Sequence, residues 1–390
     1  MSTDATQTGT STAATSSAYV PRKIDEFLKE VLSRNGSDLH FIAGDPPRVR
    51  LYGELHPLRP EPLKPEFVQE VLMEIMPRAA QMRLEEKHGA DFAYIIPGVS
   101  RFRVNVMRHL YGLGCVCRAI PSKALSLDQL NMPDAVRNLC KVNSGLILVT
   151  GKTGSGKSTT LAAMIDDMNA RMKGHILTIE DPIEYLHPHK LAVVNQREIG
   201  QDTLSFKGAL RYVLRQDPDV VLVGEMRDLE TIEAALTIAE TGHLVFATLH
   251  TNTAVSTINR IIDVFPPHQQ DQIRNKLSFV LQGVITQQLL PRAGAPGRCL
   301  AMEIMVPNVA IRNLIRENKI HQIYGSMQVG QDKYGMMTLN QSLLNLYLRR
   351  FITLEQALNQ STEADELKSM IEQANAKAGQ MGGRPQQPYR

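Results

Sequence analysis

Leu146-Ile-Leu-Val-Thr-Gly-Lys-Thr-Gly-Ser-Gly-Lys-Ser-Thr159 is the stretch of this 390-residue sequence that decides its fold. It begins with an unbroken apolar strand, residues 146–150, and continues into the pattern G-x-x-x-x-G-K-S at Gly151–Ser158. Residues 159–169 then have the apolar spacing of a helix. A strand, such a loop and a helix in this order predict a phosphate-binding loop.

Each residue type in this loop has a physical reason to be there. Glycines let backbone N–H groups converge on phosphate oxygens, and the following helix directs its positive end toward them. Lys157 reaches the β- and γ-phosphates, and the hydroxyl of Ser158 ligates Mg²⁺. We therefore expect ATP and Mg²⁺ as ligands. The expected nucleotide contacts are Thr153, Gly154, Ser155, Gly156, Lys157, Ser158 and Thr159.

The region around the loop has the pattern of an α/β domain. Apolar runs at 176–179, 220–223 and 244–249 alternate with helical patterns. Continuous apolar strands that alternate with helices predict a parallel sheet covered on both faces. Residues 268–373 have mostly helical patterns, so we expect this domain, 141–373, to end in a helical C-terminal part.

The sequence before the loop predicts a smaller α+β domain over residues 20–121. Its strand-like runs at 38–42, 48–51, 92–96, 101–109 and 115–120 are interrupted by a helical stretch near 65–87. Residues 122–140, which follow Pro121 and contain Pro133 among polar residues, have the composition of a linker. The polar segments 1–19 and 374–390 are expected to be disordered tails, because they bury too little apolar area to offset their ordering entropy.

Composition limits the possible functions. Apolar residues make up 43% of the chain and charged residues 21%, which is typical of a globular protein. A net charge of +3 is far from the strong positive charge that is typical of proteins that bind nucleic acid, so a DNA translocase is disfavoured. The four cysteines include no C-x-x-C pair, so we expect no zinc site and reduced thiols in the cytosol. We find neither a signal peptide nor an apolar run long enough to span a bilayer.

Acidic residues follow two of the predicted strands. Glu180-Asp-Pro-Ile-Glu184 comes after 176–179, at the edge where ligands of parallel sheets bind. A carboxylate there orients or deprotonates the attacking water, and the pattern alone does not choose between Glu180 and Glu184. Glu225 follows 220–223, which resembles a Walker B strand with Gly224-Glu225 in place of the usual terminal aspartate. We expect Glu225 to hold Mg²⁺ directly or through water.

Two histidines bracket the strand 244–249. At about 3.3 Å per residue, His243 and His250 lie about 23 Å apart, so they do not share one phosphate. His250 is at the carboxyl end and is our candidate phosphate sensor, whereas a structural role is favoured for His243, whose function the sequence alone does not determine. In the first domain, clean alternation points Phe102 inward and Arg101 and Arg103 outward. These arginines either form a solvated basic face or act as arginine fingers on the ATP of another domain or subunit.

Together these motifs resemble the secretion-ATPase superfamily and, within it, the PilT family of type IV pilus retraction motors. The resemblance covers residues 22–372. It rests on the phosphate loop, on His175–Glu184, on Asp217-Pro-Asp219 with Gly224–Asp228, and on Glu240-Thr-Gly-His243 with His250. Its most discriminating part is Ala310-Ile311-Arg312-Asn313-Leu314-Ile315-Arg316-Glu317, which looks like the family's retraction-associated motif.

The resemblance implies a homohexameric ring of subunits, each with a PAS-like N-terminal domain and a RecA-like ATPase domain. It implies Glu184, rather than Glu180, as the catalytic glutamate. It also implies the inner-membrane platform protein PilC as partner, pilin through it, and the paralogue PilU. The expected location is the cytoplasmic face of the inner membrane, at the base of the pilus.

By itself, 310–317 is the pattern of an ordinary amphipathic surface helix. Ile311, Leu314 and Ile315 form one apolar stripe, with Arg312 and Arg316 on a neighbouring face. The resemblance makes it instead a segment that couples ring motion to the membrane platform or positions one domain against the next.

Several other functions share these motifs, because a phosphate loop alone does not separate hydrolases, kinases and mechanical ATPases. Assembly motors for pilus extension or type II secretion usually carry a longer N-terminal region and a tetracysteine motif, which this sequence lacks. PilU is close, but we expect it to diverge at 310–317. A scaffold that binds nucleotide without useful work is disfavoured by Glu184 and Glu225.

Overall fold

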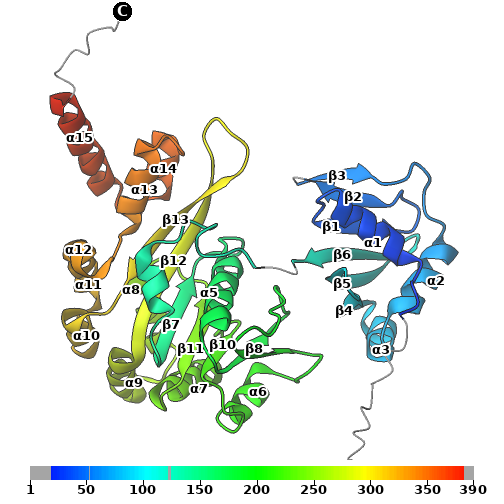
Figure 1. Cartoon of the computed structure of the whole chain (residues 1–390), viewed down its shortest axis with the longest axis horizontal. Helices are drawn as coiled ribbons and strands as arrows, with labels where there is room; N and C mark the ends of the chain where they lie inside the picture. The colour runs from blue at the N-terminus through cyan, green and yellow to red at the C-terminus, as the bar shows by residue number, and fades with distance from the viewer. Residues whose placement is uncertain (1–18, 52, 122–123, 382–390) are drawn as a thin grey trace, which may run out of the picture. The chain divides into compact units, whose positions relative to one another are not determined.

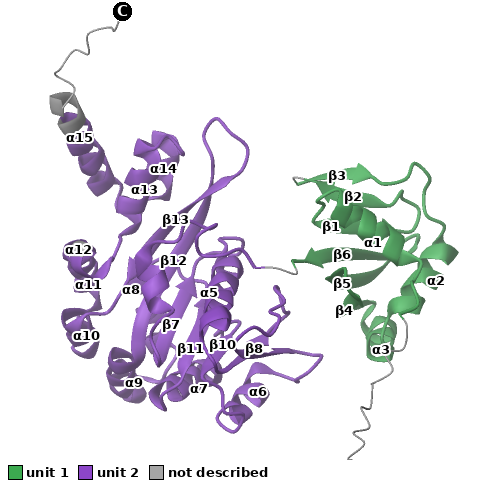
Figure 2. Ribbon diagram, viewed as in Figure 1, with its two compact units in different colours: residues 1–121 green, residues 122–390 purple. Residues whose placement is uncertain are grey.

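The computed structural model describes residues 19–51, 53–121 and 124–381, which form two compact units. The units are residues 1–121 and 122–390 (Figure 2). The outer parts of both predicted tails, 1–18 and 382–390, lie outside the described residues. Among helices in the described ranges, none combines the length and apolar character needed to cross a bilayer.

Unit 1 is the predicted α+β domain, with a fully antiparallel six-stranded sheet in the order β3-β2-β1-β6-β5-β4. The helical stretch near 65–87 is two helices, because Pro77 lacks the N–H that would continue the first one. The elements are α1 Ile24–Ser33, β1 Asp38–Ile42, β2 Arg48–Leu51, β3 Glu54–Pro57, α2 Pro65–Ile75, α3 Arg78–Lys87, β4 Gly89–Ile96, β5 Ser100–His109 and β6 Gly112–Ile120.

Unit 2 is built on a seven-stranded sheet in the order β13-β12-β7-β11-β10-β8-β9 (Figure 1). The strands from β12 to β9 pair in parallel, which confirms the predicted parallel sheet, and β13 adds an antiparallel edge. The strands are β7 Gly145–Thr150, β8 His175–Glu180, β9 Val193–Glu198, β10 Val220–Val223, β11 Leu244–Leu249, β12 Leu281–Pro291 and β13 Arg298–Met305.

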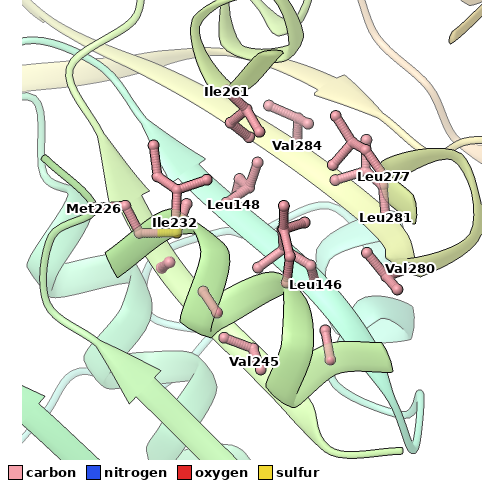
Figure 3. Packing of buried hydrophobic residues seen from close by; sticks show 14 of the residues in the cluster. Leu146, Leu148, Met226, Ile232, Val245, Ile261, Leu277, Val280, Leu281 and Val284 are labelled. Carbon is pink, nitrogen blue, oxygen red and sulfur yellow. The ribbon is translucent and has the colours of Figure 1, made fainter. Parts of the chain in front are cut away.

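Helices cover both faces of this sheet. Leu146 and Leu148 of β7 pack in the cluster shown in Figure 3, while Ile147 and Val149 belong to the core on the opposite face. Burial on both faces is why these strands are apolar without alternation. The covering helices are α4 Asp134–Leu139 and α5 Lys157–Arg171 on the second face, and α6 Phe206–Val213, α7 Leu229–Glu240, α8 Ala254–Asp263 and α9 Pro267–Val280 on the first.

Residues 268–373 are mostly helical, as expected, but the expectation was wrong for residues 281–305. Strands β12 and β13 form a long hairpin there, and β12 lies directly beside β7 in the sheet. Short apolar runs such as Val284-Ile285 fit a buried strand as well as a buried helix, so periodicity did not separate them. The helices that follow are α10 Val309–Arg316, η1 Ile320–Gln322, α11 Ile323–Val329, α12 Gln331–Tyr334, α13 Leu339–Leu348, α14 Leu354–Gln360 and α15 Ala364–Met381.

Two segments expected to lack structure are folded where the structure describes them. Much of 124–140, expected to be linker, packs into the core of unit 2 through Leu127, Met132 and helix α4. Helix α15 extends to Met381, so the beginning of the segment 374–390 is helical.

Helix α10 contains the predicted apolar stripe and also a half-buried arginine. Ile311 and Ile315 are fully buried. Arg312, expected on the face next to this stripe, is half-buried: its guanidinium donates hydrogen bonds to the Ser278 and Phe279 carbonyls at 2.7 and 3.0 Å. It therefore satisfies the last carbonyl groups of α9, which have no partner within that helix.

We predict that Ile315→Ala lowers the free energy of unfolding by about 2–5 kcal/mol, because the substitution leaves a cavity in a closed core. Val309→Ala on the same helix is the control. Val309 is 76% exposed, so its loss should cost less than about 0.5 kcal/mol. Urea denaturation followed by circular dichroism measures both, and equal effects would contradict the burial of Ile315.

Candidate nucleotide-binding and catalytic site

The predicted phosphate loop joins the carboxyl end of β7 to the amino end of α5. Gly156 precedes the helix with a φ of 93°, a left-handed conformation that glycine adopts without strain. No side chain caps the helix and its first turn holds no acidic residue. The free N–H groups of the loop and first turn are therefore available to an anion.

Lys157 lies over the loop that precedes it. Its Nζ donates hydrogen bonds to the carbonyl oxygens of Gly151 and Lys152, at 2.8 and 3.2 Å. Burial lowers the pKa of Lys157, and the negative charges of Glu225 and Glu184 oppose that shift. Both predicted carboxylates thus act electrostatically on this ammonium group, so they lie at the same edge of the sheet.

Two further observations fit a bound Mg²⁺–nucleotide. Within the described residues, the buried Oγ of Ser155 has no hydrogen-bond partner, as expected of a donor that awaits a phosphate oxygen. Ser158 is half-buried at the start of α5, and Glu225 supplies carboxylate oxygen. Hydroxyl and carboxylate oxygens are ligands that Mg²⁺ prefers, so these two residues suit the metal.

Glu180 and Glu184 have different surroundings. The Glu180 carboxylate accepts hydrogen bonds from Thr178 Oγ1 at 2.6 Å, Gln196 Nε2 at 3.3 Å and the backbone N–H of Glu184. Burial raises the pKa of Glu180, partly offset by these bonds. Glu184 is exposed, and its carboxylate has no hydrogen bond or ion pair among the described residues. The geometry therefore favours Glu184 for contact with a reacting water.

Glu225 follows β10 at a point where the backbones come close together. A Cβ on Gly224 would lie 3.2 Å from the Ile179 carbonyl oxygen, which explains why the sequence has glycine there. The Glu225 carboxylate contacts Arg227 at 2.6 Å and His250 at 3.1 Å. Burial raises its pKa, but Arg227 and His250 outweigh this and the net pKa is lowered. Glu225 is therefore ionised at neutral pH.

The two histidines flank opposite ends of β11, as the sequence predicted. His250 contacts Glu225 and so joins the edge that carries Lys157. His243 Nδ1 lies 3.1 Å from Thr241 Oγ1 and 3.2 Å from the Ile238 carbonyl oxygen, contacts that hold the end of α7. The structural role expected for His243 agrees with these contacts.

The predicted arginines belong to unit 1. Phe102 of β5 is fully buried and Arg103 is exposed, with its Nε 3.9 Å from Asp91 Oδ1. Arg101 is half-buried. Their role on the nucleotide of another subunit stays a prediction.

Several residues around the site were not predicted from the sequence. Tyr185 OH lies 2.9 Å from Thr159 Oγ1 and joins the segment after β8 to the phosphate-loop helix. Gln196 and Glu198 approach the same segment from β9. Their strand went unrecognised because Val193–Glu198 contains few apolar residues. Arg227 was part of a quoted motif, and its spacing from Glu225 was the available signal.

A phosphate loop at the carboxyl edge of a parallel sheet, with carboxylates beyond neighbouring strands, defines a P-loop ATPase with a RecA-like core. The chain belongs to the family of type II/IV secretion system proteins, whose model matches residues 13–382.

Individual relatives make the comparison more specific. The chain is 49% identical over 334 residues to the type IV pilus retraction ATPase PilT of Pseudomonas aeruginosa, covering 86% of this chain and 96% of that one. It is 38% identical over 349 residues to the type IV pilus ATPase PilU of the same organism, covering 90% and 91%. A crystal structure of the pilus retraction motor PilT with bound ADP superposes with a TM-score of 0.84 at 50% identity, covering 90% and 100%.

We predict that Glu184→Gln keeps nucleotide binding but lowers the rate of ATP hydrolysis by about 10²–10⁴-fold, because only proton transfer from water is lost. Steady-state phosphate release and binding of a fluorescent ATP analogue measure the two properties. Glu230→Gln, the same change at an exposed carboxylate of α7, should leave both unchanged. Turnover near wild type in Glu184→Gln would move the assignment to Glu180.

Proposed function

We propose that this chain hydrolyses ATP to power the retraction of type IV pili, and with it pilus disassembly and twitching motility. The observation that carries the proposal is the 49% identity to a pilus retraction ATPase across 96% of that relative's length. The Glu184 carboxylate has no hydrogen-bond partner among the described residues and acts electrostatically on Lys157, which supports hydrolysis rather than nucleotide binding alone.

In the proposed mechanism each residue at the carboxyl edge of the parallel sheet has a separate role. Lys157 gives up its two loop carbonyls and binds the β- and γ-phosphates, where negative charge increases in the transition state. Ser158 and Glu225 would hold Mg²⁺, which would neutralise phosphate charge. Glu184 accepts the proton of the attacking water. His250, beside Glu225, senses whether the γ-phosphate is present.

The working assembly in this proposal is a homohexamer at the cytoplasmic face of the inner membrane. Arg101 and Arg103 contact the ATP of a neighbouring subunit, which the exposure of Arg103 on β5 supports. The partners are the platform protein PilC, pilin through it, and PilU.

Helix α10, with residues 310–317, is proposed to couple the ring to its load. Arg312 also contacts β12, because its Nη2 donates a hydrogen bond to Gln282 Oε1 at 3.2 Å. In the sheet, Leu281 pairs with Leu146 near the start of β7, whereas the phosphate loop follows the end of that strand. A helix at the far end of the strands from the nucleotide is suited to transmitting motion rather than to chemistry.

The recovery of ATPase activity in mixtures of inactive variants tests whether Arg103 contacts the ATP of a neighbouring subunit. Arg103→Ala and Lys157→Ala should each abolish turnover, because one removes charge supplied across the interface and the other removes the phosphate contact. Mixtures of the two purified variants should recover activity through interfaces that carry both intact residues. Absence of recovery at every mixing ratio would argue against contact between subunits.

The biological role is tested in cells. Deletion of the gene should leave cells with excess pili and without twitching, and the wild-type gene should restore both. Arg316→Glu, on the exposed end of α10, should keep ATP hydrolysis in vitro but fail to restore twitching. A deletion strain without pili would instead identify an extension motor, and one that still twitches would identify an accessory motor such as PilU.

A further inference from the structure

Strand β9 presents polar side chains toward the segment that carries Glu184. The register pairs Thr178 with Gln196 and Glu180 with Glu198, so these four side chains lie on one face of the sheet. Polar residues at four adjacent positions of a mostly apolar sheet require a reason, because burying polar groups costs free energy unless they are hydrogen-bonded.

Gln196 forms three hydrogen bonds at this face. Its Nε2 donates to the Tyr185 carbonyl oxygen at 2.8 Å and to Glu180 Oε1 at 3.3 Å. Its Oε1 accepts the backbone N–H of His187 at 2.8 Å. One side chain thus fixes the backbone on the carboxyl side of Glu184.

Neighbouring groups fix the backbone on the other side. Glu198 Oε2 accepts the N–H of Ile183 at 3.0 Å, and Glu180 accepts the N–H of Glu184 itself. Tyr185 adds its contact with Thr159 of the phosphate-loop helix. The backbone is held on both sides of Glu184, while the carboxylate of Glu184 stays unbonded within the described residues.

We infer that Gln196 is a positioning residue for ATP hydrolysis: it holds the 183–187 backbone so that the Glu184 carboxylate meets the attacking water. The inference rests on the proposed role of Glu184. Gln196 does not contact the nucleotide in this inference, because its side chain is hydrogen-bonded to Tyr185, His187 and Glu180.

The position of the Glu184 carboxylate relative to the attacking water limits the rate of hydrolysis. A general base acts only within hydrogen-bond reach of the proton it accepts, and displacement by about 1 Å lowers the rate by as much as about a hundredfold. Removal of the Gln196 amide frees one carbonyl and one N–H next to Glu184, so the segment shifts. Binding of ATP, which depends on the phosphate loop, is unaffected.

The test uses Gln196→Met, which keeps the length of the side chain and removes its hydrogen bonds. We expect kcat to fall about ten- to a hundredfold with KM for ATP within about threefold of wild type. Asn195→Ala is the matched control. Asn195 lies on the same strand with its side chain on the other face, bonded to His175 Nε2 at 2.9 Å, and its loss should leave kcat unchanged.

The combination with Glu184→Gln separates positioning from general destabilisation. If Gln196 acts through Glu184, the double variant should be no more than about twofold slower than Glu184→Gln alone. Losses that multiply, or wild-type kcat in Gln196→Met, would overturn the inference while leaving the role of Glu184 intact. Wild-type kcat in Glu184→Gln would overturn the proposed base, and the positioning role with it.

Discussion

Four parallel strands, β7, β11, β10 and β8, end at the same edge of one sheet, and the whole candidate site depends on that register. The phosphate loop follows β7, Glu184 follows β8, Glu225 follows β10 and His250 follows β11. Residues that are separated by up to about a hundred positions in the sequence therefore lie at one edge of the folded sheet. The apolar packing on both faces fixes this register, because a shift of one residue would move each side chain to the opposite face and disrupt the packing of both cores.

Charged side chains are concentrated at this carboxyl edge of the sheet. Lys157 is buried beside two carboxylates, and Glu225 is held ionised by Arg227 and His250. Such an arrangement is prepared for a ligand that carries several negative charges and a metal ion. It also explains the division between the two acidic residues after β8, since Glu180 is occupied with hydrogen bonds and Glu184 faces outward.

The sequence was sufficient for the strands that carry the site, because each is an unbroken apolar run next to a recognisable motif. It was insufficient where structure depends on neighbours in space. Strand β9 is polar and β12 is indistinguishable from a helix by periodicity, so the sheet was predicted without β9 at one edge and without the β12–β13 hairpin at the other. The contacts of Arg312 were not predicted because its partners, the carbonyls at the end of α9, lie more than thirty positions earlier in the chain. Gln196 was missed for the same reason.

We infer that the phosphate loop and the segment after β8 form one nucleotide site. Hydrogen–deuterium exchange of the purified protein, with and without Mg²⁺ and a non-hydrolysable ATP analogue, tests whether both segments respond to the nucleotide. Slower exchange on binding in both 151–159 and 180–187 is the expected result. Protection confined to 151–159, with exchange at 180–187 unchanged, would contradict it, because Glu184 would then lie outside the site that binds ATP.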